Sequence, residues 1–370
     1  MKKENPFVVV GYRSPKLFCD RVKETKRLIG ALENGRNVTL IAPRRYGKTG
    51  LIHHVFNAMS PDVQCLYLDI YALKNLTEFS KSFATAVLGM LDTPVEKVLA
   101  SVAGFFTSCR PTITPQEDGT PKFSFDIQPN QAEATLGETF AYLKKKGQNV
   151  VIAIDEFQQI LEFPEAGTEA LLRGYVQSVP DVRFVFAGSR HHLMGEMFLS
   201  AKHPFYQSTD IMSLGVVDKE AYSAFAQAKF EEAKQSFKKE AFNALYDRFS
   251  GITWYLQVIM NRLWENGEGL VNKSQIDEIV SELVEDRALI FRDFYFSQTE
   301  SCQSLLSAIA KEGVVRAVFS GEFISRHKLI ATSTVRSALK ALEDKDLVYR
   351  TENGYIVYDR ILAEWLKMRN

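Results

Sequence analysis

In the first half of the chain, short runs of mostly apolar residues alternate with amphipathic stretches of helical period. The clearest runs are Val38–Ile41, Gln64–Ile70, Val150–Ile154 and Phe184–Ala187. Short, nearly continuous apolar runs are typical of parallel strands that are buried on both faces of a sheet. Because helical patterns separate them, the sequence predicts the α/β fold class, with a parallel sheet and crossover connections.

Two further patterns surround these strands. A helical pattern from residue 18 or 20 to residue 32 precedes the first strand, and Asn34-Gly35 follows it as a helix-ending pair. The stretch from residue 92 to residue 131 is less regular and contains five prolines, and Lys122–Ile127 alternates as a hairpin or an edge strand does. We predict that this stretch is an insertion on the flank of the sheet.

The pattern changes after about residue 214, where strand-like runs stop. Helical patterns cover residues 219–230, 239–249, 254–266 and 273–296, and shorter ones cover 301–311, 321–328 and 333–344. A hairpin then follows, in which Leu347–Thr351 and Tyr355–Tyr358 flank an Asn-Gly turn. Three helices followed by a hairpin form a winged helix. We therefore expect a core in residues 1–213, a helical lid in residues 214–297 and a winged-helix domain in residues 298–370.

Composition limits the class of protein without naming a function. A chain of 370 residues suits two or three domains. The 45 Lys and Arg residues balance the 45 Asp and Glu residues, so no overall field attracts nucleic acid or an anionic membrane. The four cysteines are far apart and form no metal-ligand spacing, which indicates a reducing compartment. The apolar run Phe7–Val10 is too short for a signal sequence or a membrane span, so we expect a cytoplasmic protein without a membrane partner.

The strand at residues 38–41 leads into a loop that ends in Gly-Lys-Thr, and a helical pattern follows. A phosphate cradle requires this order, because loop N–H groups and a helix N-terminus bind phosphate oxygens. Lys48 can reach the β- and γ-phosphates, and the Thr49 hydroxyl can ligate Mg²⁺. The residues predicted to contact a nucleotide are those of the loop and the helix start, namely Ala42, Pro43, Arg44, Arg45, Tyr46, Gly47, Lys48, Thr49 and Gly50.

One position departs from the G-x-x-x-x-G-K-[ST] pattern, since Ala42 replaces its first glycine. Alanine lacks the freedom of glycine at positive φ, so the turn is either altered or does not need that freedom. Two interpretations also stay open for Arg44 and Arg45, which either contact phosphate or brace the loop against an acid.

The strand at residues 150–154 delivers two acids, Asp155 and Glu156, at its C-terminal end. Carboxylates there need partners, and a nucleotide with Mg²⁺ supplies one. We predict that Asp155 holds the metal, mainly through water, and that Glu156 is the general base that activates water. The alternative is a helix cap at Asp155 and a solvated Glu156. Ser189 follows the strand at residues 184–187. It is expected to lie beside the attacking water or the γ-phosphate; the alternative is that it belongs to an ordinary turn. Glu156, Lys48 and Ser189 are the candidate catalytic residues.

These motifs resemble those of the prokaryotic (archaeal and bacterial) P-loop ATPases of the AAA+/STAND group, over nearly the whole chain. Residues 42–49 are similar to the Walker A motif of the family, Ile154–Phe157 to its Walker B motif and Ala187–Ser189 to its sensor-1 strand. Phe18–Arg21 looks like the N-terminal box beside the adenine, and Tyr355–Trp365 looks like the closing winged-helix segment. The resemblance implies that the nucleotide is ATP and that its metal is Mg²⁺.

Two positions depart from the family pattern. Where the family often carries an arginine after sensor 1, this chain has Ser208, and Thr253 replaces the proline of the Gly-x-Pro motif in the lid. Absence of an arginine finger can lower the rate of hydrolysis by about 10³–10⁵. The resemblance therefore implies intact nucleotide binding with slow hydrolysis.

We accordingly expect an ATPase that binds Mg²⁺ and ATP and acts as a slow nucleotide-dependent switch. Two alternatives stay open: a DNA-binding protein that reads duplex with its winged helix under control of ATP, and a degenerate ATP binder that does not hydrolyse ATP. Arg336, Lys340, Lys345 and Arg350 permit DNA contact. The zero net charge instead favours a docking surface for an unknown protein partner.

Overall fold

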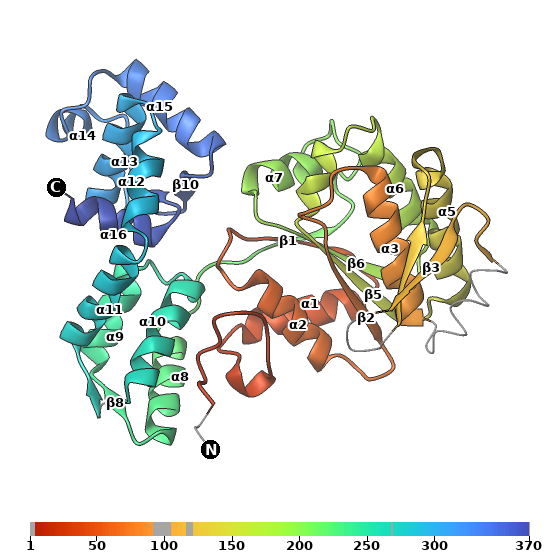
Figure 1. The fold of residues 1–370 in the computed structure, drawn as a ribbon, viewed down its shortest axis with the longest axis horizontal. Helices are drawn as coiled ribbons and strands as arrows, with labels where there is room; N and C mark the ends of the chain where they lie inside the picture. The colour runs from red at the N-terminus through yellow and green to blue at the C-terminus, as the bar shows by residue number, and fades with distance from the viewer. Residues whose placement is uncertain (1–3, 92–104, 116–120, 268, 370) are drawn as a thin grey trace. The chain divides into compact units, whose positions relative to one another are not determined.

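The computed structural model describes residues 4–91, 105–115, 121–267 and 269–369. They form two compact units, one that spans Val10–Val217 and one that begins at Asp218 and includes the residues before Val10 (Figure 1).

A five-stranded parallel sheet forms the centre of the first unit, in the order β2-β5-β6-β1-β7. The strands are β1 (Val38–Ile41), β2 (Gln64–Asp69), β5 (Val150–Asp155), β6 (Val182–Gly188) and β7 (Asp210–Ser213). This sheet confirms the predicted fold class. It also contains β7, which was not predicted, because this short edge strand is half exposed and carries a polar residue at each end.

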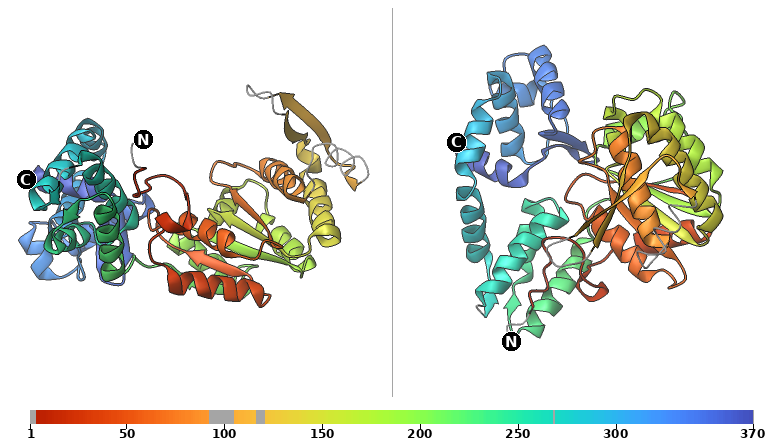
Figure 2. Two further views of the ribbon diagram at one scale, coloured as in Figure 1. Left: turned by 90° about the horizontal axis from the view of Figure 1, so that it is seen from below. Right: turned by 45° about the vertical axis from the view of Figure 1, so that its right-hand side comes forward.

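Helices cover both faces of this sheet (Figure 2). They are α1 (Val22–Glu33), α2 (Lys48–Ala58), α3 (Leu76–Leu91), α5 (Ala132–Lys146), α6 (Thr168–Ser178) and α7 (His191–Leu199), with the 3₁₀ turns η1 (Pro15–Leu17), η2 (Pro129–Gln131) and η3 (Phe157–Glu162). The main core lies between the sheet and α3, α5, α6 and α7. Phe79 and Phe83 of α3 lie one turn apart, and Phe83 stacks on Phe140 of α5 at 5.2 Å between ring centroids.

An antiparallel hairpin lies between α3 and α5 in the sequence. Its strands are β3 (Arg110–Pro115) and β4 (Pro121–Asp126), which confirms the hairpin predicted around residues 122–127. Phe125 of β4 is fully buried in a small separate core with Phe106 and Tyr142. This core also includes Ala84 and Leu88 of α3, so the hairpin packs on α3 and α5, on the flank of the sheet as predicted. Residues 92–104 and 116–120 of the predicted insertion lie outside the described residues.

The second unit begins with a helical segment, α8 to α12. Its helices are α8 (Lys219–Glu232), α9 (Lys239–Arg248), α10 (Thr253–Asn266), α11 (Lys273–Glu285) and α12 (Ala288–Phe296). Two details of the prediction are wrong. The short strands β8 (Ser236–Phe237) and β9 (Leu270–Val271) pair in parallel within this segment, and their two-residue length leaves no periodic signal. The expected helix over residues 273–296 is broken after Asp286, because the backbone at Arg287, with a φ of −116° and a ψ of 0°, departs from helical geometry before α12 begins.

A winged helix closes the chain, as predicted. It comprises α13 (Glu300–Glu312), α14 (Gly321–Arg326), α15 (Thr332–Asp344), β10 (Val348–Thr351), β11 (Gly354–Val357) and α16 (Arg360–Met368). The Asn-Gly turn joins β10 to β11, and Gly354 has a φ of +133°. A Cβ atom at Gly354 would lie 2.5 Å from the carbonyl oxygen of Val315. Glycine therefore lets the backbone at Val315 approach the hairpin closely.

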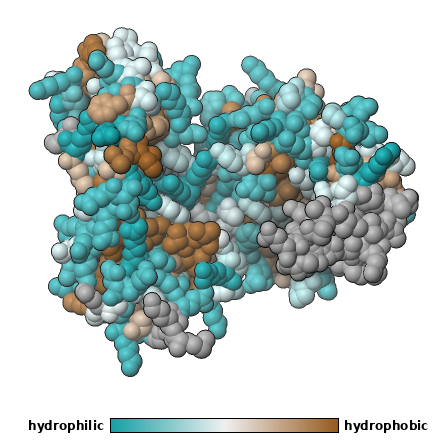
Figure 3. All heavy atoms as spheres, viewed as in Figure 1, coloured by the Kyte–Doolittle hydropathy of each residue, from teal (hydrophilic) through white to brown (hydrophobic). Residues whose placement is uncertain are grey.

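Residues 4–9 pack with the second unit. The buried Phe7 ring lies 5.4 Å from that of Phe230, and the Asn261 amide donates to the carbonyl of Phe7 at 2.7 Å. Hydrophilic residues predominate on the surface seen in Figure 3, and the exposed apolar side chains include Leu289 and Ile290 of α12. Among the helices described, none combines the length and apolar character needed to cross a membrane.

Candidate functional site

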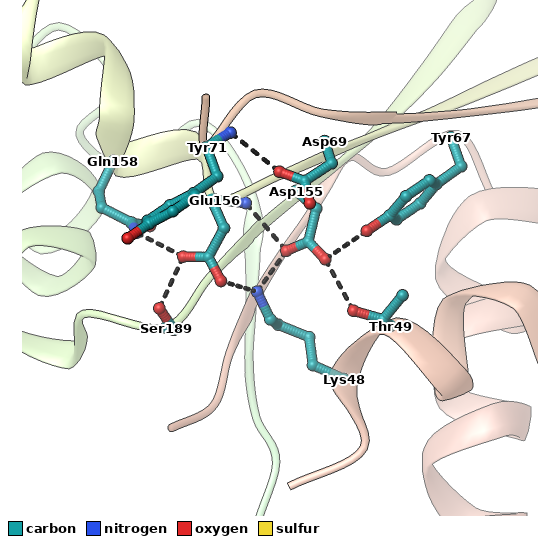
Figure 4. A network of polar contacts seen from close by, with 9 residues as sticks. All are labelled: Lys48, Thr49, Tyr67, Asp69, Tyr71, Asp155, Glu156, Gln158 and Ser189. Atoms are coloured by element: carbon teal, nitrogen blue, oxygen red, sulfur yellow. Dashed lines mark hydrogen bonds and ion pairs between the residues drawn. The ribbon is translucent and has the colours of Figure 1, made fainter. Parts of the chain in front are cut away.

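The carboxyl ends of β1, β6 and β5 meet at one edge of the sheet, because these parallel strands are neighbours in that order. The loop at residues 42–47 follows β1, Asp155 and Glu156 lie at the end of β5, and Ser189 directly follows β6. Figure 4 shows that side chains from all three strand ends converge in one polar network. The topology therefore brings the three predicted catalytic residues together.

The loop after β1 takes its shape from two residues other than Ala42. Positive φ angles occur at Arg45 (+73°) and at Gly47 (+88°), which is the N-cap of α2. Ala42 does not have a positive φ. It is fully buried, and its N–H donates to the carbonyl of Gly188 at 3.1 Å. The loop therefore does not need glycine at this position, which resolves the alternative left open by the sequence.

Arg21 braces the loop from behind. Its buried guanidinium donates to the Tyr46 carbonyl at 3.0 Å and to the Gly215 carbonyl at 2.8 Å, and it pairs with Glu24 at 3.0 Å. Sequence reasoning assigned this segment to the surroundings of the adenine and missed the contact with the loop, for which the motif carries no signal. Arg44 lies over the ring of Tyr71 at 4.9 Å from its centroid.

Lys48 and Asp155 form the centre of the network. The Lys48 ammonium donates to Oδ1 of Asp155 and lies 3.3 Å from Oε1 of Glu156. The other oxygen of Asp155, Oδ2, accepts hydrogen bonds from the Thr49 hydroxyl at 2.9 Å and from the Tyr67 hydroxyl at 2.7 Å. Both side chains of the ion pair are almost fully buried, so Asp155 is no simple helix cap.

The electrostatics of Asp155 follow from these contacts. Burial by itself raises the pKa of this carboxyl, but the charge of Lys48 and the hydrogen bonds from Lys48, Tyr67 and Thr49 outweigh burial and lower the pKa below its usual value. Asp155 is therefore ionised at neutral pH, as a metal ligand must be.

Glu156 is held from several sides. It has a φ of +57°, and its side chain is only 14% exposed, so the alternative of a solvated carboxylate does not describe this structure. Its Oε2 atom accepts hydrogen bonds from the Ser189 hydroxyl and from the Gln158 amide, both at 2.6 Å. Ser189 is thus a partner of Glu156 and not merely a turn residue.

Tyr67 and Gln158 were not identified from the sequence. Tyr67 of β2 pairs with Ala153 of β5. Ala153 lies two residues before Asp155, so both residues point to the same face of the strand. Only the order of strands reveals this neighbour, since nothing in the sequence places β2 beside β5. Burial and the nearby Asp155 raise the pKa of Tyr67, so its hydroxyl stays protonated and donates. The His53 ring lies 4.6 Å from that of Tyr67, and burial lowers the pKa of this imidazole.

The donor set suits a nucleotide with Mg²⁺. A helix N-terminus and the Lys48 ammonium are ligands for phosphate. The Thr49 hydroxyl and the Asp155 carboxylate are oxygen ligands, and Mg²⁺ is commonly held by one or two carboxylates together with substrate phosphates. Within the described residues, no group of three or more His, Cys, Asp or Glu side chains forms the kind of cage that would hold a metal by itself.

Comparison with protein families matches two segments. Residues 18–259, more than half of the chain, match an ATPase domain predominantly from Archaea, and residues 289–368 match a probable winged helix domain. A comparison with curated proteins gives no match.

Solved structures resemble the chain over nearly its full length. The Walker-type ATPase PABY2304 of Pyrococcus abyssi has a TM-score of 0.66 and 17% identity, with 98% of this chain and 99% of that chain covered. The ORC2 protein of Aeropyrum pernix has a TM-score of 0.49 and 15% identity, covering 100% and 98%. The RuvB Holliday junction branch migration motor of Thermotoga maritima has a TM-score of 0.46 and 14% identity, covering 95% of each chain. At these identities, the likeness to PABY2304 concerns the fold.

Proposed function

The chain belongs to the family of ATPase domains found predominantly in Archaea, a family of P-loop ATPases, and we propose that it binds ATP with Mg²⁺ and hydrolyses it slowly as a nucleotide-dependent switch. One observation carries the proposal: Lys48 bridges Asp155 and Glu156, while Thr49 donates to the same Asp155 carboxylate. The phosphate-binding lysine, the two candidate metal ligands and the candidate base of a phosphoryl-transfer site thus form one connected network.

The roles of these residues follow from their chemistry. Lys48 and the N–H groups at the start of α2 bind the phosphates. Thr49 and Asp155 would hold Mg²⁺, which would neutralise negative charge on the phosphates. When phosphate oxygens attract Lys48, Glu156 loses its contact with the ammonium and can accept a proton from water. The Ser189 hydroxyl holds the Glu156 carboxylate in place.

Slow turnover is the expected consequence of the residue after sensor 1. The Ser208 hydroxyl donates to the Phe205 carbonyl of its own turn and offers no positive charge to the γ-phosphate. We propose that the chain works in three parts, an ATPase core over residues 1–213, a helical lid over residues 214–297 and a winged helix over residues 298–370.

The winged helix is proposed to dock a protein partner. Three of its basic side chains are engaged within the unit: Arg336 lies 4.9 Å over the Phe319 ring, Arg350 lies 5.8 Å over the Tyr355 ring and Lys345 donates to a side-chain oxygen of Gln298. Together with the zero net charge of the chain, these contacts favour docking over duplex binding.

Thermal unfolding with and without nucleotide tests the proposal. ATP with Mg²⁺ at about 100 times its Kd should stabilise the protein by roughly 2.7 kcal/mol. Glu156→Gln should keep this stabilisation and lose hydrolysis, because the amide keeps the shape of the side chain and cannot accept the proton. GTP serves as the comparison for base preference. If no nucleotide raises the melting temperature of the folded protein at millimolar concentration, the proposal is wrong.

A further inference from the structure

Gln158 is a buried polar residue in the first turn of η3, and the roles assigned above do not use it. Gln158 is only 4% exposed, and its Nε2 atom donates a hydrogen bond to Oε2 of Glu156 at 2.6 Å. Figure 4 shows that this amide and the Ser189 hydroxyl approach the same carboxylate oxygen.

Packing fixes the position of this amide. A Cβ atom at Gly188 would lie 2.5 Å from Oε1 of Gln158 and 2.4 Å from Sδ of Met194, so the bare backbone at the end of β6 makes room for both side chains. The carbonyl oxygen of Gln158 is buried and has no hydrogen-bond partner among the described residues. Rotating the amide would bring this oxygen against the Glu156 carboxylate, where two acceptors repel each other. The Nε2 atom therefore has to face Glu156.

An unpartnered buried carbonyl destabilises the folded protein, so folding alone does not explain an amide at this position. An apolar side chain of the same length would fill the space without that cost. What the amide contributes is the hydrogen bond to Glu156.

We propose that Gln158 is a positioning residue for hydrolysis, an inference that rests on the proposed role of Glu156 as the general base. Gln158 and Ser189 together occupy Oε2 and fix the plane of the carboxylate. The remaining oxygen, Oε1, faces Lys48 at 3.3 Å and becomes available when phosphate attracts the ammonium. Water then gives a proton to Oε1 while its oxygen bonds to the γ-phosphorus. The bond from that phosphorus to the bridging oxygen breaks, and ADP leaves with the electron pair.

Kinetics of the full chain test this role. Gln158→Met keeps the length of the side chain without the donor, and Gln158→Asn keeps the amide but is too short to reach Glu156. Both variants should keep KM and the melting shift with ATP and Mg²⁺, and kcat should fall roughly 10–100-fold, since small misplacement of a reacting group has costs of this order.

The neighbouring glutamine supplies a matched control. The Gln159 side chain lies on the same turn and donates to the Leu73 carbonyl at 3.2 Å, away from the Glu156 carboxylate, so Gln159→Met should leave kcat unchanged. In a Glu156→Gln background, Gln158→Met should cause no further loss of the residual rate, because the residue acts through Glu156.

The outcomes separate this inference from the proposed function. If Glu156→Gln abolishes hydrolysis while folded Gln158→Met and Gln158→Asn turn over at the wild-type rate, Gln158 does not position the base. If Glu156→Gln hydrolyses ATP as the wild type does, or the wild type shows no turnover, the general-base assignment itself fails and the inference falls with it.

Discussion

Lys48→Ala should destabilise the protein before any nucleotide is added. The Lys48 and Asp155 side chains are 6% and 4% exposed, so the substitution leaves a buried carboxylate without its cation. Breaking a buried ion pair by removing one partner costs about 3–5 kcal/mol. Because the hydroxyls of Thr49 and Tyr67 still donate to Asp155, we expect the lower end, about 3 kcal/mol.

The assay is a double-mutant cycle by urea and thermal unfolding, near neutral pH, with EDTA and without nucleotide. For a unit of this size, about 3 kcal/mol lowers the melting temperature by roughly 6–12 °C. Asp155→Asn added to Lys48→Ala should recover part of the loss, because it removes the uncompensated charge. Lys219→Ala is the control, since its pair with Asp247 is exposed and should contribute at most about 1 kcal/mol.

Two results would refute this reasoning. One is a Lys48→Ala protein that unfolds at the wild-type midpoint, and the other is a cycle in which the two substitutions are additive. Either would mean that the ion pair is not formed in the nucleotide-free protein. A confirmed loss would require the nucleotide affinity of Lys48→Ala to be measured at a temperature where this variant is still folded.

Three other predictions address the metal, acid stability and the winged helix. Asp155→Asn should weaken nucleotide binding in the presence of Mg²⁺ and leave the binding measured with EDTA nearly unchanged, as titration calorimetry would detect. Because folding lowers the pKa of Asp155, its ionised carboxylate stabilises the folded protein at pH values above the unfolded pKa of 3.8. This stabilisation should be lost as the pH falls through the lower pKa of the folded state. If Asp155→Asn and wild type show the same pH dependence in an acid titration followed by circular dichroism, the prediction is wrong. The wild-type protein should not bind short duplex DNA at low salt. Joint replacement of Arg336, Lys340 and Arg350 by Glu should leave the melting shift with ATP intact and change partner capture or the ATPase rate. Tight, salt-sensitive binding of DNA would show that the docking proposal is wrong.

The sequence predicted the parts of the fold that carry a local signal. Four strands of the sheet are mostly apolar runs, and the hairpin at β10 and β11 is marked by its Asn-Gly turn. β7 lacks such a signal because it is a half-exposed edge strand with Asp210 and Ser213 at its ends. The break between α11 and α12 falls at Asp286, where a polar residue is equally compatible with a continuous helix.

The site could be predicted only where a motif names its members. Lys48, Thr49 and Asp155 lie in motifs that imply one another, and the structure brings them into contact. Tyr67 and Gln158 joined the site only when the strands and the η3 turn were placed in space. The contact of Tyr67 depends on β2 and β5 being neighbours in the sheet, and the contact of Gln158 depends on the space left by Gly188 at the end of β6. Neither arrangement can be read from the residues that adjoin Tyr67 or Gln158 in the sequence.

The strand order also has a consequence for how the protein is made. Both sheet neighbours of β1 come late in the chain, since Val38 pairs with Val185 of β6 and with Asp210 of β7. During synthesis, β1 and its loop emerge long before either partner exists, and they stay unpaired until the ribosome has passed most of the unit. Such non-local pairing slows folding and exposes apolar segments to aggregation or chaperones. The loop after β1 should therefore be among the first parts to be synthesised and among the last to acquire its structure.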